Sequence, residues 1–188
     1  MRKLVLFENI TLDGFFTGKD GDFSWAHQDP PDPEFQSFLH DNAKGGGTLA
    51  FGRKTYEMMA SHWPTKAGRE SDPAIAKIMN DSPKIVFSKS LKEATWSNTR
   101  LVKTDPVKEM QALKAEAGSP IVIMGSGSIV ALLARARLID SLQVIVKPIA
   151  IGRGRSLFEG LEELQRYRLV RSRGFTASGN TFCEYERM

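Results

Sequence analysis

The segment Ile121-Val-Ile-Met-Gly-Ser-Gly-Ser128 constrains the fold of this 188-residue chain more than any other. The apolar run Ile121–Met124 predicts a short buried strand, and Ile129–Ile139 predicts a helix that follows after a tight turn. Gly125 and Gly127 permit the unusual φ values and the close backbone approach of such a turn. Backbone N–H groups and the positive end of a helix dipole then point at one spot, which favours a phosphate group.

Short apolar runs alternate with segments of helical periodicity along the rest of the chain. This alternation predicts one domain over residues 1–188, a three-layer α/β/α fold with a mostly parallel mixed sheet that ends in an antiparallel C-terminal hairpin. The expected strands are Arg2–Ile10, Thr48–Phe51, Lys84–Phe87, Leu101–Lys103, Ile121–Met124, Ser141–Pro148, Gln165–Phe175 and Thr181–Arg187. The expected helices are Pro33–Asn42, Arg53–Ser61, Pro73–Asn80, the segment from Asp105-Pro106 to Gly118 and the helix behind the glycine turn, whereas Thr11–Pro33 is expected to be a long loop.

Composition excludes several classes of function. The single cysteine, Cys183, excludes an intramolecular disulfide, and the scattered His27, His40 and His62 lack the spacing of metal ligands, so we expect no metal. No apolar run approaches the ~20 residues of a membrane span, and the chain start lacks a signal core, so we expect a cytoplasmic protein without a membrane partner. The net charge is +4, but the basic residues are not interleaved with aromatic residues as in a nucleic-acid-binding surface. The excess positive charge therefore favours an anionic small molecule, or plain solvated surface, over nucleic acid.

The glycine turn differs from two well-known phosphate-binding motifs. A dinucleotide-binding Rossmann fingerprint needs a third glycine, and Val130 occupies that position. A Walker loop needs a Gly-Lys-Ser/Thr sequence, which does not follow here. Considered alone, the turn therefore fits either a phosphate site or an ordinary strand-to-helix connection.

Anion-compatible residues follow two further expected strands. After the strand Thr48–Phe51, Gly52 is followed by two basic residues and a threonine at the start of the next helix. After the strand Lys84–Phe87 come Ser88 and Lys89. Each group alone also fits a helix cap or a solvated charge. Because the carboxyl ends of parallel strands meet at one edge, the three groups together favour a ligand with several phosphates, such as a dinucleotide with a 2′-phosphate. The candidate residues are Gly52, Arg53, Lys54, Thr55, Ser88, Lys89, Gly125, Ser126, Gly127 and Ser128.

Five short motifs, taken in their order along the chain, resemble the dihydrofolate reductase fold. They are Thr11-Leu-Asp-Gly14, Gly52-Arg-Lys-Thr55, Phe87-Ser-Lys89, Met124-Gly-Ser-Gly127 and Pro148-Ile-Ala-Ile-Gly-Arg-Gly154. The closer likeness is to the C-terminal reductase domain of the bifunctional riboflavin-biosynthesis deaminase–reductase and its stand-alone relatives. This resemblance implies NADPH as cofactor, hydride transfer to a nitrogen heterocycle or its ribose-derived chain, and a homodimer.

The resemblance also assigns roles on the cofactor side. Gly125, Ser126, Gly127 and Ser128 would face the pyrophosphate. The segment Gly52–Thr55 would hold the phosphates from the other side, with Arg53 and Lys54 as cations. Ser88 and Lys89 would bind the 2′-phosphate and so favour NADPH over NADH.

On the substrate side the resemblance points to four residues. Asp13 and Gly14 would abut the nicotinamide, where Asp13 holds the substrate or positions the carboxamide; a plain Asp-Gly turn is the alternative. Glu34 lies where dihydrofolate reductases carry the carboxylate that grips the pterin and assists its protonation, or else it complements the helix dipole. Trp25 would close over the nicotinamide or the substrate, or else serve packing alone.

Two departures from these families narrow the expected activity. The mobile loop of dihydrofolate reductases usually carries a Pro-Trp pair, and the nearest match here is Phe23-Ser-Trp25, which disfavours folate reduction. No zinc deaminase signature is present. The chain thus resembles 5-amino-6-(5-phosphoribosylamino)uracil reductase of riboflavin biosynthesis. The alternatives are a dihydrofolate or pterin reductase and a non-catalytic nucleotide-binding or regulatory protein.

Overall fold

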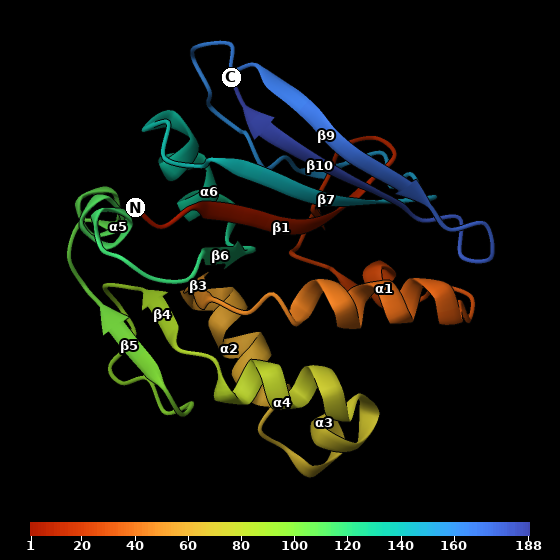
Figure 1. The fold of residues 1–188 in the computed structure, drawn as a ribbon, viewed down its shortest axis with the longest axis horizontal. Helices are drawn as coiled ribbons and strands as arrows, with labels where there is room; N and C mark the ends of the chain where they lie inside the picture. Colours follow the sequence, from red (N-terminus) through yellow and green to blue (C-terminus); the bar gives the residue numbers. More distant parts are fainter.

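An eight-stranded sheet forms the centre of the computed structural model, which describes residues 1–188. Its strands are β1 Leu4–Thr11, β3 Thr48–Gly52, β4 Lys84–Phe87, β5 Thr99–Val102, β6 Ile121–Met124, β7 Ser141–Lys147, β9 Tyr167–Gly174 and β10 Thr181–Arg187. They follow the order β5-β4-β3-β6-β1-β7-β10-β9. All neighbours from β5 to β7 are parallel, and β10 runs antiparallel to β7 and β9, so the predicted mixed sheet with its C-terminal hairpin is confirmed (Figure 1).

The register of the central strands opens a crevice in the sheet. β6 pairs with β1 only as far as Met124 opposite Phe7, and its chain then turns away. β1 continues beside β7 for four more residues, up to Thr11 opposite Lys147. The second half of β1, from Glu8 onward, therefore has a paired neighbour on one side only. Ligands of open α/β sheets bind in such a crevice beyond the carboxyl ends of parallel strands.

Helices cover both faces of the sheet, as predicted. They are α1 Pro33–Ala43, α2 Arg53–His62, α3 Lys66–Ser71, α4 Pro73–Asp81, α5 Pro106–Ala115 and α6 Gly127–Arg135. Three of them begin in the same way, because an aspartate accepts a hydrogen bond from a first-turn N–H and a proline occupies the first helical position. These capping aspartates are Asp32, Asp72 and Asp105. None of the helices combines the length and apolar character that a membrane crossing requires.

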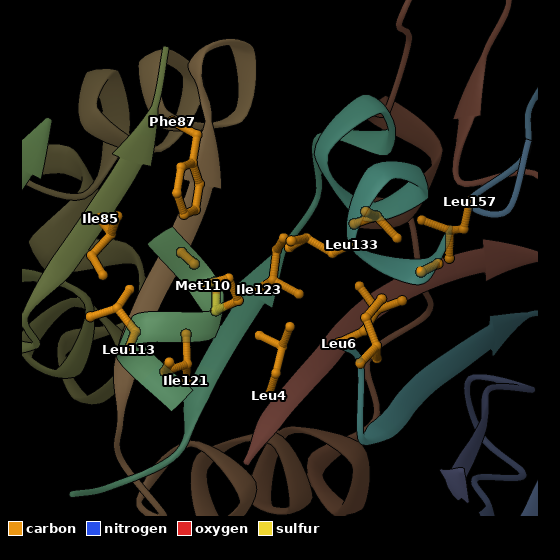
Figure 2. Packing of buried hydrophobic residues seen from close by; sticks show 14 of the residues in the cluster. Leu4, Leu6, Ile85, Phe87, Met110, Leu113, Ile121, Ile123, Leu133 and Leu157 are labelled. Carbon is orange, nitrogen blue, oxygen red and sulfur yellow. The ribbon is translucent and has the colours of Figure 1, made fainter. Parts of the chain in front are cut away.

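The alternation of side chains along each strand divides the core between the two faces. Ala50 of β3 packs with residues of α5 and α6, whereas its neighbours Leu49 and Phe51 pack with α2 and α4. A third cluster joins α1 to β7 and β10. Figure 2 shows the largest cluster, in which β1, β4 and β6 direct apolar side chains toward Met110 of α5 and Leu133 of α6. Burial on both faces explains why these strands are continuous apolar runs.

Short elements in several parts of the chain differ from the sequence-based expectation. The segment Thr11–Pro33 is not a plain loop, because it contains the short strand β2 (Thr17–Gly18) and the 3-10 helix η1 (Ser24–His27). β2 pairs with β8 (Gly154–Arg155), which anchors the long connection to a distant part of the chain. The helix α3 was not predicted, since its six residues are almost all polar or small and carry no apolar period.

Candidate functional site

A cavity of about 1180 Å³ lies over the crevice beside β1. Its floor includes residues of β1, β6 and β7, and its walls come from α1, α2, α4 and the Thr11–Pro33 segment. The volume exceeds the roughly 300–1,000 Å³ of an ordinary small-molecule pocket, so one large ligand or two smaller ones fit inside. Of the predicted cofactor residues, the lining includes Lys54, Thr55, Gly125, Ser126 and Gly127.

Two helix N-termini meet at one side of this cavity. Gly52 precedes α2 and Ser126 precedes α6, and neither residue caps its helix with a side-chain hydrogen bond. The hydroxyl oxygens of Thr55 and Ser126 lie 3.0 Å apart and join the two helix starts. The first N–H groups of both helices and the positive ends of two dipoles are thus available to an anionic ligand. The sequence prediction that these two segments converge is confirmed.

The close approach of the helix starts depends on glycine. Gly125 has φ +64°, and a Cβ atom there would lie only 2.8 Å from Thr55 Oγ1. A Cβ atom on Gly52 would overlap the Ser126 hydroxyl, and one on Gly127 would overlap the ring of Phe16. Ser126 itself holds a left-handed φ of 67°, which is strained for a residue with a side chain. The small residues thus form a cradle, with two hydroxyl groups as additional hydrogen-bonding partners, that suits the phosphates of a dinucleotide.

The other predicted cofactor residues lie outside the cavity lining. Arg53 is exposed and pairs with Glu57 at 3.1 Å, one turn further along α2. Ser88 Oγ accepts hydrogen bonds from the N–H groups of two following residues and so shapes the turn after β4. Lys89 and Ser128 are exposed. The 2′-phosphate role of Ser88 and Lys89 stays a prediction.

Asp13 is engaged in holding two loops together. Its carboxylate accepts hydrogen bonds from the Thr11 hydroxyl and from the backbone N–H groups of Ile151 and Gly152. The Thr11 hydrogen bond, followed by those backbone donors, lowers the pKa of Asp13. Neither Asp13 nor Gly14 lines the cavity, and Gly14 holds a φ of +83°. This geometry agrees with the turn-forming alternative, and the catalytic or substrate-binding role of Asp13 stays a prediction.

Glu34 points away from the cavity, so the prediction that it faces the substrate is wrong. Its carboxylate forms an ion pair with Arg173 of β9 at 2.6 Å, and more than half of its side-chain surface is exposed. The neighbouring Phe35 occupies the inward position of α1 and lines the cavity instead. One step along a helix turns a side chain by about 100°, which places Glu34 on the surface.

Trp25 is buried beneath the wall of the cavity rather than exposed to it. Its ring packs edge-on against Phe23 with centroids 5.2 Å apart. Phe23, Ala26 and His27 line the cavity, whereas Trp25 does not. Its indole N–H is buried without a hydrogen-bond partner in the chain. The packing alternative therefore describes Trp25 better than closure over a ligand.

Sequence reasoning missed Glu8, a buried carboxyl group in the cavity lining. Glu8 is 6% exposed and lies on β1 at the point where β6 has turned away. Burial raises its pKa to about 8, and hydrogen bonds from the N–H groups of Asn9 and Gly125 oppose that effect only in part. The available signal was an acidic residue directly after the apolar run Leu4–Phe7 of a strand that continues past it.

A second polar group that was missed lies at the far end of β7. Lys147 is almost fully buried, forms an ion pair with Asp29 and lies 5.1 Å from the Phe35 ring centroid. Asn180 donates to the same Asp29 carboxylate at 2.9 Å. Lys147 and Asp29 both line the cavity, so they add a polar patch to its wall.

Comparison with known proteins agrees with this geometry. A putative riboflavin biosynthesis protein from Shewanella sp. PV-4 superposes with a TM-score of 0.77 at 23% identity, covering 99% of each chain. The dihydrofolate reductase of Enterococcus faecalis, solved with NADP(H) and RAB-propyl, gives a TM-score of 0.63 at 18% identity, covering 98% of this chain and 96% of that one. A pyrimidine reductase-like protein from Corynebacterium diphtheriae gives 0.67 at 14% identity, covering 100% and 92%.

The chain shares its fold and topology with a dihydrofolate reductase. The chain belongs to the RibD C-terminal domain family, whose model matches residues 2–182. Two relatives from Bacillus subtilis strain 168, the uncharacterized proteins YyaP and YwjB, are each 26% identical to it. The matches cover 94% of this chain and 90% of YyaP, and 93% of this chain and 92% of YwjB.

Proposed function

We propose that this protein is an NADPH-dependent reductase that transfers a hydride to a heterocyclic or ribosylamino-pyrimidine substrate. The observation that carries the proposal is the meeting of two helix starts without side-chain caps at Thr55 and Ser126, on the wall of a cavity large enough for a dinucleotide and a substrate. Membership of the RibD C-terminal domain family supports it. So does the fold shared with a dihydrofolate reductase that was solved with NADP(H).

The cofactor's phosphates would bind at the glycine-rich cradle. The backbone N–H groups of Ser126 and Gly127 and the hydroxyl of Thr55 would donate to the phosphates, and Lys54 adds a positive charge to the same wall. Ser88 and Lys89, at the end of β4 two strands away from β6, remain the proposed site of the 2′-phosphate. A reduced nicotinamide supplies a hydride, and the chain's task is to orient both ligands and exclude water.

The substrate side of the cavity combines an apolar wall with amide and charged groups. Phe35 and Leu39 of α1 form an apolar surface for a flat ring. Asn9 and Gln143 line the floor, and amides of this kind suit the donors and acceptors of a pyrimidine edge. Lys19 and Arg155 line the cavity as well, and their exposed positive charges suit an anionic substituent. A ribosylamino-pyrimidine such as 5-amino-6-(5-phosphoribosylamino)uracil carries both a polar ring edge and a phosphate.

Pterin reduction is the weaker alternative. The residues of α1 that line the cavity include no carboxylate, since Glu34 lies on the surface with Arg173. The capping residue Asp32 also lines the cavity, but its oxygens accept hydrogen bonds from Phe35 N–H and from the N–H and hydroxyl of Ser178. An aminopyrimidine edge would thus find no free carboxylate on this wall.

Cofactor titration followed by turnover tests the proposal. Calorimetric titration should give tighter binding for NADPH than for NADH, and NADPH should raise the melting temperature. Absorbance of NADPH should then fall on addition of 5-amino-6-(5-phosphoribosylamino)uracil and not on addition of dihydrofolate. Binding without oxidation of either substrate would favour the non-catalytic alternative, and absence of NADPH binding would overturn the proposal altogether.

A further inference from the structure

We infer that Glu8 is the acid that donates the proton to the substrate during reduction, an inference that rests on the proposed reductase function. Hydride addition to a C=N or C=O bond leaves a nitrogen or oxygen that must gain a proton. The residues with acidic side chains predicted for this role, Asp13 and Glu34, are both engaged outside the cavity. Glu8 lies inside it.

The position of Glu8 follows from the strand register. β6 ends opposite Phe7, so the next residue of β1 has no strand neighbour on that side and borders the space that opens there. The chain of the glycine turn passes beside it, since a Cβ atom on Gly125 would lie 3.4 Å from Glu8 Oε2. The carboxyl group therefore adjoins the cradle proposed for the cofactor and lines the cavity that would hold the substrate.

The other buried or half-buried carboxylates of the cavity lining already have side-chain partners. Asp29 binds Lys147 and Asn180, Asp32 binds Ser178, and Asp72 binds His40. Glu8 has no such partner, and its hydrogen bonds within the chain come only from backbone N–H groups. Among the buried and half-buried carboxyl groups of the lining, Glu8 is therefore the one without a side-chain partner, whereas Asp20, which also lines the cavity, is exposed to solvent.

The cations around the cavity do not neutralise Glu8. Lys19, Lys54 of α2 and Arg155 of β8 line the same space, and none of them forms an ion pair with Glu8; Lys147 of β7 is paired with Asp29. Arg155 lies 3.9 Å from Glu159 and packs near the Phe16 ring. Burial without a counter-charge raises the pKa of Glu8 to about 8, so the group carries its proton near neutral pH. A proton donor works best with a pKa near the working pH.

The reaction balances with this assignment. The substrate carbon gains a hydride from the reduced nicotinamide, and the neighbouring nitrogen or oxygen takes a proton from Glu8 as the O–H bond of the carboxyl group breaks. Glu8 is left as a carboxylate and regains a proton from water. In sum, one NADPH and one proton from solvent reduce one double bond.

Proton release on binding of the oxidised cofactor tests the inference without a substrate. Oxidised nicotinamide carries a positive charge, and a positive charge beside a carboxylic acid lowers the pKa of that acid by about 1–3 units. Near pH 7, the wild type should therefore release more protons on binding NADP⁺ than on binding NADPH, measured calorimetrically in buffers of different ionisation enthalpy. The difference should vanish in Glu8→Gln and persist in the control Glu163→Gln, an exposed glutamate far along the chain. Equal release by wild type and Glu8→Gln would overturn the inference.

Turnover provides the second measurement, with 5-amino-6-(5-phosphoribosylamino)uracil as the probe. The wild-type rate should fall about tenfold per pH unit above the pKa of Glu8, and Glu8→Gln should be about 10²–10⁴-fold slower with that pH dependence removed. Glu8→Asp, which retains the carboxyl group, should recover part of the rate. A Glu8→Gln variant that binds NADPH and keeps wild-type rates would refute the role of Glu8 and leave the proposed reductase intact. Failure of the wild type to bind NADPH would instead refute the reductase proposal.

Discussion

The hydroxyl groups of Thr55 and Ser126 lie 3.0 Å apart although 71 residues separate them in the sequence. Their contact joins the start of α2 to the start of α6. Each residue follows the carboxyl end of a parallel strand, and β3 and β6 are adjacent in the sheet. The proposed cofactor site thus depends on how closely two helix N-termini approach each other.

Gly125→Ala should separate these helix starts. The added methyl group would lie 2.8 Å from Thr55 Oγ1, so one of the two segments must move. We expect NADPH affinity to fall at least about tenfold, because the phosphate donors lose their common geometry. Fluorescence titration with NADPH measures this loss.

Gly152→Ala is the matched control for that variant. Gly152 also has a positive φ, +72°, but a Cβ atom there meets nothing within 4 Å. Both variants should therefore lose about 1–2 kcal/mol of unfolding free energy from backbone strain. An equal loss of NADPH affinity in the two variants would argue against the cradle as the binding site.

Lys89→Ala should weaken NADPH binding and leave NADH binding unchanged. Lys89 is exposed after β4, and removing an exposed positive charge near a phosphate should raise the NADPH dissociation constant by roughly 2–5-fold at low salt. Parallel titrations with both cofactors measure the selectivity, with Lys92→Ala as the control for a lost surface charge. If both cofactors weaken equally in Lys89→Ala, its 2′-phosphate role must be abandoned.

Glu8 should make the stability of the free protein decrease with rising pH. The pKa of Glu8 is about 8 when folded, against an ordinary value of 4.5, so between these pH values the folded state retains a proton that the unfolded state has lost. The unfolding free energy should therefore fall by up to about 1.4 kcal/mol per pH unit through this window and level off above it. Denaturant unfolding across pH 5–8 should show a shallower slope for Glu8→Gln. A wild-type slope retained in that variant would place the titrating group elsewhere.

Lys84→Met should destabilise the fold. The buried ammonium group donates to the carbonyl oxygens of Met79, Asn80 and Ser82 at 2.7–3.0 Å, where α4 ends. Loss of these hydrogen bonds should cost about 2–4 kcal/mol of unfolding free energy. Lys77→Met, which removes only an exposed ion pair with Asp81, should cost less than about 0.5 kcal/mol in the same denaturation experiment.

Local sequence signals were sufficient for most of the fold. The strands at Lys84–Phe87 and Ile121–Met124 are buried on both faces or nearly so, and such continuous apolar runs stand out from polar flanks. Asp32 and Asp72 each precede a proline and cap a helix, as their sequence context predicts. The pairing of β2 with β8 was not predictable in this way, because strands of two residues carry no periodicity.

The site residues were predictable only where their position follows from the ends of the predicted strands. Thr55 and Gly125 follow strand ends, so parallel topology alone brings them together. Glu34 was misassigned because an offset of one helical residue decides whether a side chain faces a cavity or the solvent. Glu8 was missed because its burial depends on where β6 leaves β1, which is a property of the tertiary register.

Because α2 and α6 have no side-chain caps, the free energy of unfolding of this protein should depend on the concentration of its cofactor. An anion that bonds to those N–H groups stabilises only the folded chain, so the unfolding free energy should rise with the logarithm of cofactor concentration, by about 2.7 kcal/mol at 100 times the dissociation constant. Proteolytic lifetime and abundance would then follow the cellular pool of the dinucleotide. A chain built in this way is best preserved where its ligand is plentiful and is degraded soonest where the ligand is scarce.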